Sequence, residues 1–65
     1  MYFLKRIILT QAFNATHPDY LSNQINDFLR ENDIQKIIDI KYSSFKRDDN
    51  TNDYSALLIY IGLSE

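Results

Sequence analysis

The chain has 65 residues with seven basic and nine acidic side chains, one histidine and no cysteine, which gives a formal net charge of −2. A chain of this length supports one small core, so we expect residues 1–65 to form a single domain. The composition excludes disulfide bonds, argues against a structural zinc site, and argues against a nucleic-acid-binding protein, which would carry a strong positive charge.

The first predicted element is a strand over residues 2–13, YFLKRIILTQAF, because this segment is rich in β-branched and aromatic side chains. Its opening residues could suggest a signal peptide, but Lys5 and Arg6 interrupt the apolar run and a strand fits better. Helix start signals follow the strand. Thr16 can cap a helix, and Pro18 lacks the N–H that the first turn leaves unpaired.

The predicted helix has a single apolar face. Asp19 suits the positive end of the helix, and the residues that follow show an apolar period of 3.6. The apolar stripe consists of Leu21, Ile25, Phe28 and Leu29. We expect the helix to end near Asn32 and Asp33, because both residue types favour turns over helix interiors.

Two further strands are predicted, over residues 35–45 (QKIIDIKYSSF) and residues 54–63 (YSALLIYIGL), joined by the charged loop KRDDNTND. Strict alternation in the first of them places Ile38, Ile40 and Tyr42 on one face and Ile37, Asp39, Lys41 and Ser43 on the other. The last strand is apolar on both faces, with Ala56, Leu58 and Tyr60 on one and Leu57, Ile59 and Ile61 on the other.

The strand order follows from this difference in pattern. A strand that is flanked on both edges and covered on both faces loses its alternation, so the last strand is expected at the centre of the sheet. The predicted fold is therefore an α+β unit of order β-α-β-β, with a mainly antiparallel three-stranded sheet in the order 1-3-2 and one helix crossing one face in the right-handed sense. The alternative order is 1-2-3.

One face of this sheet is expected to lack cover within the chain. A helix of about 14 residues has a footprint of roughly 200 Å², whereas three strands of about nine residues make a face of roughly 400 Å². The uncovered apolar face then needs a partner, for which a second copy of the chain is the simplest candidate, giving a homodimer or a higher homo-oligomer. The expected interface residues are Tyr2, Leu4, Ile8, Leu57, Ile59 and Ile61.

No catalytic constellation is found in the sequence. His17 beside Asp19 is interpreted as a surface residue at a helix start. The loop before the last strand has oxygen ligands spaced like the start of a calcium loop, but Tyr54 replaces the sixth-position glycine and Tyr60 the twelfth-position glutamate. Those ligands are Asp49, Thr51 and Asp53. We therefore expect no enzyme activity, no catalytic residue, no cofactor and no metal site.

One cluster suggests a small ligand. Lys46 and Arg47 stand near Tyr42, Phe45 and Tyr54, and paired cations beside aromatic rings can hold a phosphate and a base together. The alternative interpretation is an ordinary strand end with basic side chains that extend into water. If the cluster binds a ligand, a nucleotide-like anion is expected.

The segments Asp39-Ile40-Lys41-Tyr42 and Ser55-Ala56-Leu57-Leu58-Ile59-Tyr60 resemble the short sporulation-associated family of Gram-positive bacteria often called the Cse-sixty type. Relatives of that family are also carried by phages. The resemblance spans nearly the whole chain after residue 1. It implies a small α+β protein, and it supplies no catalytic residues to carry over.

These observations leave two expected functions. The first is a self-associating interaction protein that binds a host or cellular protein, such as a phage-encoded inhibitor of host defence. The second is an oligomeric protein that sequesters a nucleotide-like signalling ligand. No apolar run approaches the roughly 20 residues that span a bilayer, and the absence of cysteine fits a reducing compartment. We therefore expect a cytoplasmic protein, in a bacterial cell or in the host cell of a phage, with no membrane contact.

Overall fold

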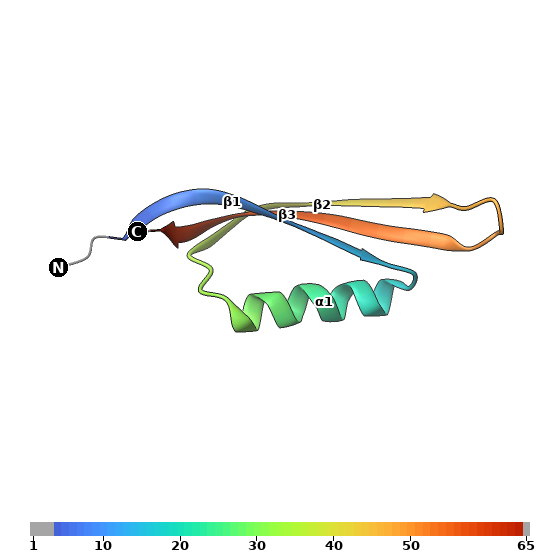
Figure 1. Cartoon of the computed structure of the whole chain (residues 1–65), viewed down its shortest axis with the longest axis horizontal. Coiled ribbons are helices and arrows are strands. Elements are labelled where there is room, and N and C mark those ends of the chain that lie inside the picture. The colour runs from blue at the N-terminus through green and yellow to red at the C-terminus, as the bar shows by residue number, and fades with distance from the viewer. Residues whose placement is uncertain (1–3, 65) are drawn as a thin grey trace.

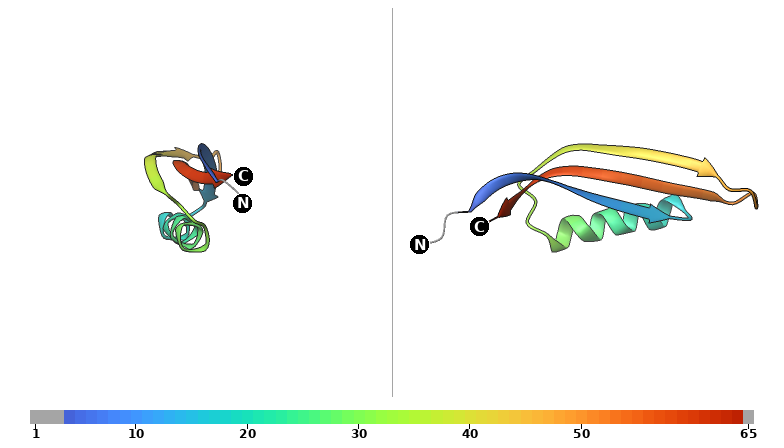
Figure 2. Two further views of the ribbon diagram at one scale, coloured as in Figure 1. Left: turned by 90° about the vertical axis from the view of Figure 1, so that its left-hand side faces the viewer. Right: turned by 45° about the horizontal axis from the view of Figure 1, so that its top comes forward.

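The computed structural model describes residues 4–64, which form four elements in the order β-α-β-β (Figure 1). The elements are β1 (Lys5–Ala15), α1 (Pro18–Glu31), β2 (Lys36–Lys46) and β3 (Asn52–Ser64). The strands form one antiparallel sheet in the order β1-β3-β2, which confirms the predicted fold class and strand order. The end-on view of Figure 2 shows α1 as a second layer on one face of the twisted sheet.

The core lies between α1 and the central strand. Leu58 on β3 is fully buried, and Leu21 and Ile25 of the apolar helix stripe are buried against the same side of the sheet. Aromatic rings extend this core, because Phe28 makes edge-to-face contacts with Phe13 and with Tyr60, each at a centroid distance of 5.6 Å. The helix therefore buries the face that its 3.6-residue period predicts.

The N-terminus of α1 differs from the sequence-based expectation. The N-cap residue is His17 rather than Thr16; its backbone is extended, and its carbonyl accepts a hydrogen bond from the N–H of Leu21 at 3.1 Å. Pro18 occupies the first turn, where its missing N–H leaves no donor unpaired. The fixed φ of proline starts the helix at residue 18, so the capping position falls on the residue immediately before it.

The C-terminus of α1 lies where turn residues predict it. Asn32 caps the helix, and both its backbone N–H (3.1 Å) and its side-chain amide (2.9 Å) donate to the carbonyl of Phe28. These bonds satisfy a carbonyl that the end of a helix otherwise leaves without a partner.

A β-bulge in β2 changes the faces expected for that strand. The register places Ile37 opposite Tyr60 and Asp39 opposite Ile59, which leaves Ile38 as the extra residue. Directly paired residues share a face of a sheet, so Ile37 lies on the side of α1 with Ile40 and Tyr42, and not with Asp39 as alternation predicted. Alternation alone cannot reveal an inserted residue, because the period of two resumes after it.

The molecule is long rather than spherical. Its extents are 55 × 17 × 14 Å and its radius of gyration is 14.6 Å, compared with about 11 Å for a compact chain of this length. The long shape arises because the β2–β3 hairpin projects beyond the turn that joins β1 to α1 (Figure 1). The helix α1 lies against β1 and β3 but does not reach β2, so it does not cover the full width of the sheet. Across residues 4–64, no helix is long and apolar enough to cross a membrane.

Candidate functional site

The face of the sheet that points away from α1 is apolar along β1 and β3. The register pairs Ile8 with Ile61 and places Leu57 and Ile59 on the same side. Ile8 is 69% exposed and Leu57 is 37% exposed, although both are large apolar side chains in regular strands. We call the surface formed by Ile8, Leu57, Ile59 and Ile61 the helix-free face.

The other two predicted interface residues, Leu4 and Tyr2, lie at the start of the chain, before β1. Leu4 precedes β1 and is 55% exposed. Tyr2 lies outside the described residues. Phe45, at the far end of β2, is opposite Asp53 and extends the exposed apolar surface of the sheet. The sequence had grouped Phe45 with the predicted ligand cluster, but the register places it on the opposite face of the sheet from Tyr42 and Tyr54.

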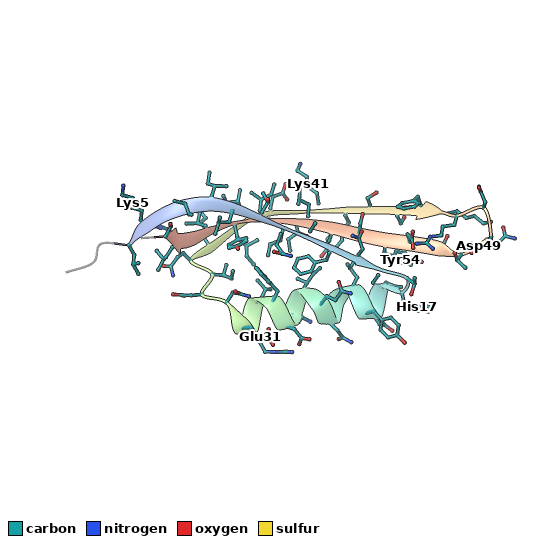
Figure 3. All side chains as sticks on the ribbon, in the orientation of Figure 1. Lys5, His17, Glu31, Lys41, Asp49 and Tyr54 are labelled. Carbon is teal, nitrogen blue, oxygen red and sulfur yellow. The ribbon has the colours of Figure 1, made fainter. Side chains whose placement is uncertain are left out.

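Charge on this side of the sheet is confined to its margins. Figure 3 shows Lys41 on the side of the sheet away from α1, and its ammonium lies 3.6 Å from a carboxylate oxygen of Asp39. Both side chains are more than half exposed, so this ion pair contributes little to stability. It leaves the centre of the helix-free face uncharged, which suits an apolar partner.

A groove opens on the opposite side of the sheet, between α1 and β2. It has a volume of about 290 Å³ and exists because α1 does not extend over β2. Tyr54 lies on β3 near both the start of the helix at His17 and the hairpin loop at Asp49 (Figure 3), and all three residues line one hollow. The groove is lined by Pro18, Leu21, Ser22, Tyr42, Ser43, Ser44, Tyr54 and Ser55.

The structure divides the predicted ligand cluster. Tyr42 and Tyr54 both line the groove, whereas Arg47 lines a second hollow of about 530 Å³ beside the hairpin loop, which Tyr54 also borders. The guanidinium of Arg47 is paired with the carboxylate of Asp53 at 2.5 Å, so its charge already has a partner. Lys46 lies opposite Asn52 at the end of the ladder and lines neither hollow.

The hairpin loop is closed by its own hydrogen bonds. The carboxylate of Asp49 accepts bonds from the hydroxyl of Thr51 at 2.6 Å and from its backbone N–H at 3.1 Å. The hydroxyl bond is the main cause that holds the pKa of Asp49 below its ordinary value of 3.8. Among the residues described, no group of three acidic or histidine side chains is arranged to hold a metal ion.

His17, the other residue considered for chemistry, packs on its own helix. Its ring makes an edge-to-face contact with Tyr20 at a centroid distance of 5.2 Å, and the side chain makes no capping bond. This contact accounts for the position of the histidine without assigning it a role in a reaction.

Comparison with known proteins gives one match. A family model described as sporulation protein Cse60 matches residues 3–62, which is nearly the whole chain. No curated protein and no solved structure matches the chain. The match includes both strand segments, Asp39–Tyr42 and Ser55–Tyr60, on which the resemblance was based, and it confirms that resemblance.

Proposed function

The chain belongs to the sporulation protein Cse60 family, and on that premise we propose that it is a non-catalytic interaction protein that self-associates through the helix-free face and binds a cellular protein. The observation that carries the proposal is the exposure of large aliphatic side chains on regular, well-paired strands, Ile8 above all. Isolated exposed apolar residues are common, but a contiguous apolar sheet face is typical of a contact surface.

The exposed area has the size that an interface requires. The chain exposes 5141 Å², whereas a compact monomer of 7.7 kDa exposes about 4,300 Å². The excess of about 800 Å² belongs to the whole long molecule, and it is similar to the area that each partner buries in an interface of standard size. A second copy supplies an identical apolar face, and twofold pairing of identical faces is the commonest way in which proteins associate.

Native mass spectrometry and light scattering over a concentration series test the self-association. We expect dimers or higher even-numbered oligomers for the natural chain, and a shift toward smaller species for Ile8→Lys and for Leu57→Lys, because each substitution buries an unpaired charge in the contact. Asn23→Lys adds the same charge on the exposed surface of α1 and serves as the control. A natural chain that is monomeric at millimolar concentration, or lysine variants that associate like the control, would contradict the proposal.

The cellular partner is assigned to the groove on the side of α1. In a dimer built through the helix-free face, this groove stays open, and its margin carries Tyr42, which is 67% exposed. Tyrosine is enriched in binding surfaces because a large ring contributes area at low entropic cost while its hydroxyl finds a polar partner. The hydroxyls of Ser22 and Ser44 around the ring supply such polar contacts.

A photo-crosslinking amino acid placed at position 42 tests this assignment in cells. We expect one discrete protein adduct for position 42 and none for position 23 on the opposite side of α1. An unlabelled chain that carries Ser22→Arg should fail to compete with the adduct, since the exposed Ser22 lines the groove and a larger side chain there fills it without touching the core. Equal adducts at both positions would show that the groove has no selective partner.

Sequestration of a nucleotide-like anion is the second candidate function. It is favoured by the position of Tyr54, which borders both the groove and the hollow that contains Arg47. A ligand at 100 times its Kd stabilises the folded state by about 2.7 kcal/mol, so a thermal shift panel of cyclic nucleotides tests this function directly. The absence of any shift would exclude the nucleotides tested.

A further inference from the structure

The two edge strands of the sheet differ in how their outer hydrogen-bonding groups are occupied. On β1, the side-chain amide of Gln24 donates to the carbonyl of Asn14 at 3.0 Å, and the amide of Gln11 donates to the carbonyl of Ala12 at 3.3 Å. These carbonyls belong to alternate residues, as expected for groups on the outer edge of an antiparallel strand. Side chains of the same molecule therefore cover part of the β1 edge.

The outer edge of β2 is open over a defined stretch. Arg47 donates its N–H to the carbonyl of Thr51 at 2.7 Å, which fixes the alternation: odd-numbered residues of β2 bond to β3 and even-numbered ones point outward. The outward N–H of Ile40 is occupied by the carboxylate of Asp39 at 2.8 Å. Beyond it, the backbone groups of Tyr42 and Ser44 face outward without a partner among residues 4–64.

The side chains of β2, the strand that carries this open edge, are exposed on both faces of the sheet. No residue of β2 is buried, and Ile40 alone is half-buried. Proteins usually protect an edge strand by a bulge, a proline, charged side chains or a covering segment, because an unprotected edge pairs readily with another strand. In β2 the bulge and the Asp39 carboxylate block backbone groups of the first half only. Lys41 and Lys46 add charge to the second half, but the outward backbone groups between them stay accessible.

From this arrangement we infer that residues 41–45 of β2 pair antiparallel with the same residues of a second copy, about a twofold axis at Ser43. In that register Tyr42 faces Ser44 of the second copy, and their outward N–H and C=O groups bond in both directions. The pairing joins two three-stranded sheets into one continuous sheet of six strands, with both α1 helices on the same side.

Charge selects both the partner and the register. With the axis at Ser43, Lys41 lies opposite the ring of Phe45. Just beyond the paired stretch, Asp39 of each copy lies opposite Arg47 of the other; each keeps its partner within the chain, Lys41 for Asp39 and Asp53 for Arg47, and gains a second opposite charge across the axis. Opposite charges and cation–aromatic pairs directly across two strands are favourable. The strand is thus complementary to its own reversed sequence, which identifies a second copy of the chain as the partner.

Other registers of the β2–β2 pair that also keep both α1 helices on one side of the sheet are less favourable. An axis at Lys41 brings two lysines face to face, and an axis at Ser44 places Lys41 opposite Arg47. Like charges directly opposite each other destabilise a pair of strands. An axis at Tyr42 avoids repulsion but loses the pairing of Asp39 with Arg47.

A single introduced cysteine tests the edge contact, because the natural chain has no thiol. The two residues at position 43 form a non-hydrogen-bonded pair across the axis, with Cα atoms about 4.5 Å apart, a distance that a disulfide spans. Under mild oxidation we expect Ser43→Cys to form disulfide-linked dimers ~100-fold faster than Thr10→Cys, because paired thiols have a high effective concentration. Thr10 is exposed on β1, opposite Ile59 on the helix-free face, where stacked sheets lie too far apart for a disulfide, so it gives the rate expected without an edge contact.

Ser44→Cys is the register control. In the inferred register its thiol is displaced from its counterpart by two residues along the strands, which separates the Cα atoms by about 8 Å, beyond the reach of a disulfide. We therefore expect Ser44→Cys to crosslink as slowly as Thr10→Cys. Fast crosslinking of Ser44→Cys, or equal rates for positions 43 and 10, would overturn the inference.

Two further variants keep the test independent of folding and of the helix-free face. In the double variant Ser43→Cys/Ser44→Pro, the proline removes the outward N–H of residue 44 but no hydrogen bond to β3. The chain should therefore keep its circular dichroism spectrum, while crosslinking falls to the Thr10→Cys rate. Ser43→Cys combined with Ile8→Lys should crosslink as fast as Ser43→Cys alone. Face-to-face sheets lie about 10 Å apart, too far for this disulfide, so failure of the proposed helix-free contact would leave the edge result unchanged.

Discussion

Leu57 and Leu58 are neighbours in the chain but lie in opposite environments. Leu58 points toward α1 and is fully buried, whereas Leu57 points to the helix-free face and is 37% exposed. The two residues have the same side chain and the same strand geometry, so a comparison between them isolates the contribution that packing against α1 makes to stability.

We predict that Leu58→Ala lowers the free energy of unfolding by about 2–5 kcal/mol, because it removes buried methyl groups and leaves a cavity at the centre of the core. Leu57→Ala should lower it by about 1 kcal/mol in the isolated chain. Urea denaturation followed by circular dichroism at sub-micromolar concentration, where copies are separated, measures both values. Equal losses would show that β3 is covered equally on both faces, contrary to the structure.

Asp49 provides a residue-scale prediction for pH. Its pKa is lowered mainly by the hydroxyl of Thr51, so the ionised form is favoured by folding. The stabilisation is therefore present above the unfolded pKa of about 3.9 and is lost as the pH falls through the lower folded pKa. Carboxyl carbon NMR titration should show the pKa of Asp49 rising toward 3.8 in Thr51→Val and staying low in Thr51→Ser, which keeps the hydroxyl. An unchanged pKa in Thr51→Val would contradict the assigned cause.

At the scale of elements, the β2–β3 hairpin depends on one backbone conformation. Asn50 has a φ of +68°, the single positive value for a non-glycine residue within residues 4–64, and its N–H donates to the carbonyl of Arg47 at 3.1 Å. A type I turn followed by a left-handed residue is a common solution for a three-residue hairpin loop. Asparagine tolerates that conformation better than most residues do.

We predict that Asn50→Ala lowers the free energy of unfolding by about 1–2 kcal/mol, because alanine is strained at positive φ, whereas Asn50→Gly stays within about 0.5 kcal/mol of the natural chain. Thermal unfolding by circular dichroism gives both values. Asn26→Ala, on the exposed face of α1, controls for loss of the amide alone. Asn50→Gly as destabilising as Asn50→Ala would show that the asparagine side chain, and not its backbone angle, holds the loop.

The elements show which structural features the sequence could predict. The apolar pattern of residues 54–63 predicted the central position of β3, and the period of Leu21 and Ile25 predicted the buried side of α1, because both depend on local periodicity. The bulge at Ile38 and the displacement of α1 from β2 were not predictable, because they depend on packing between distant segments. For the same reason the groove beside Tyr42 had no sequence signal, although the tyrosine itself had been singled out.

At the scale of the whole molecule, the long shape links stability to association. A chain that exposes about 800 Å² more than a compact monomer gains burial only by contact with another molecule. We predict that the melting temperature of the natural chain rises with protein concentration, and that this rise is smaller for Ile8→Lys and unchanged for Asn23→Lys. Differential scanning calorimetry from micromolar to millimolar concentration measures the dependence. A melting temperature that is independent of concentration would show that folding and association are not coupled.

The absence of any buried residue in β2 has a consequence for local dynamics. Separation of β2 from β3 breaks one ladder of hydrogen bonds and removes Ile40 from the edge of the core, but it leaves the contacts of α1 with β1 and β3 in place. Such a segment can open as a cooperative unit at a lower free energy than global unfolding. The strand that presents the inferred pairing edge is then the part of the sheet that the rest of the fold holds least, and pairing with another strand would raise its protection against amide hydrogen exchange before it affects the core.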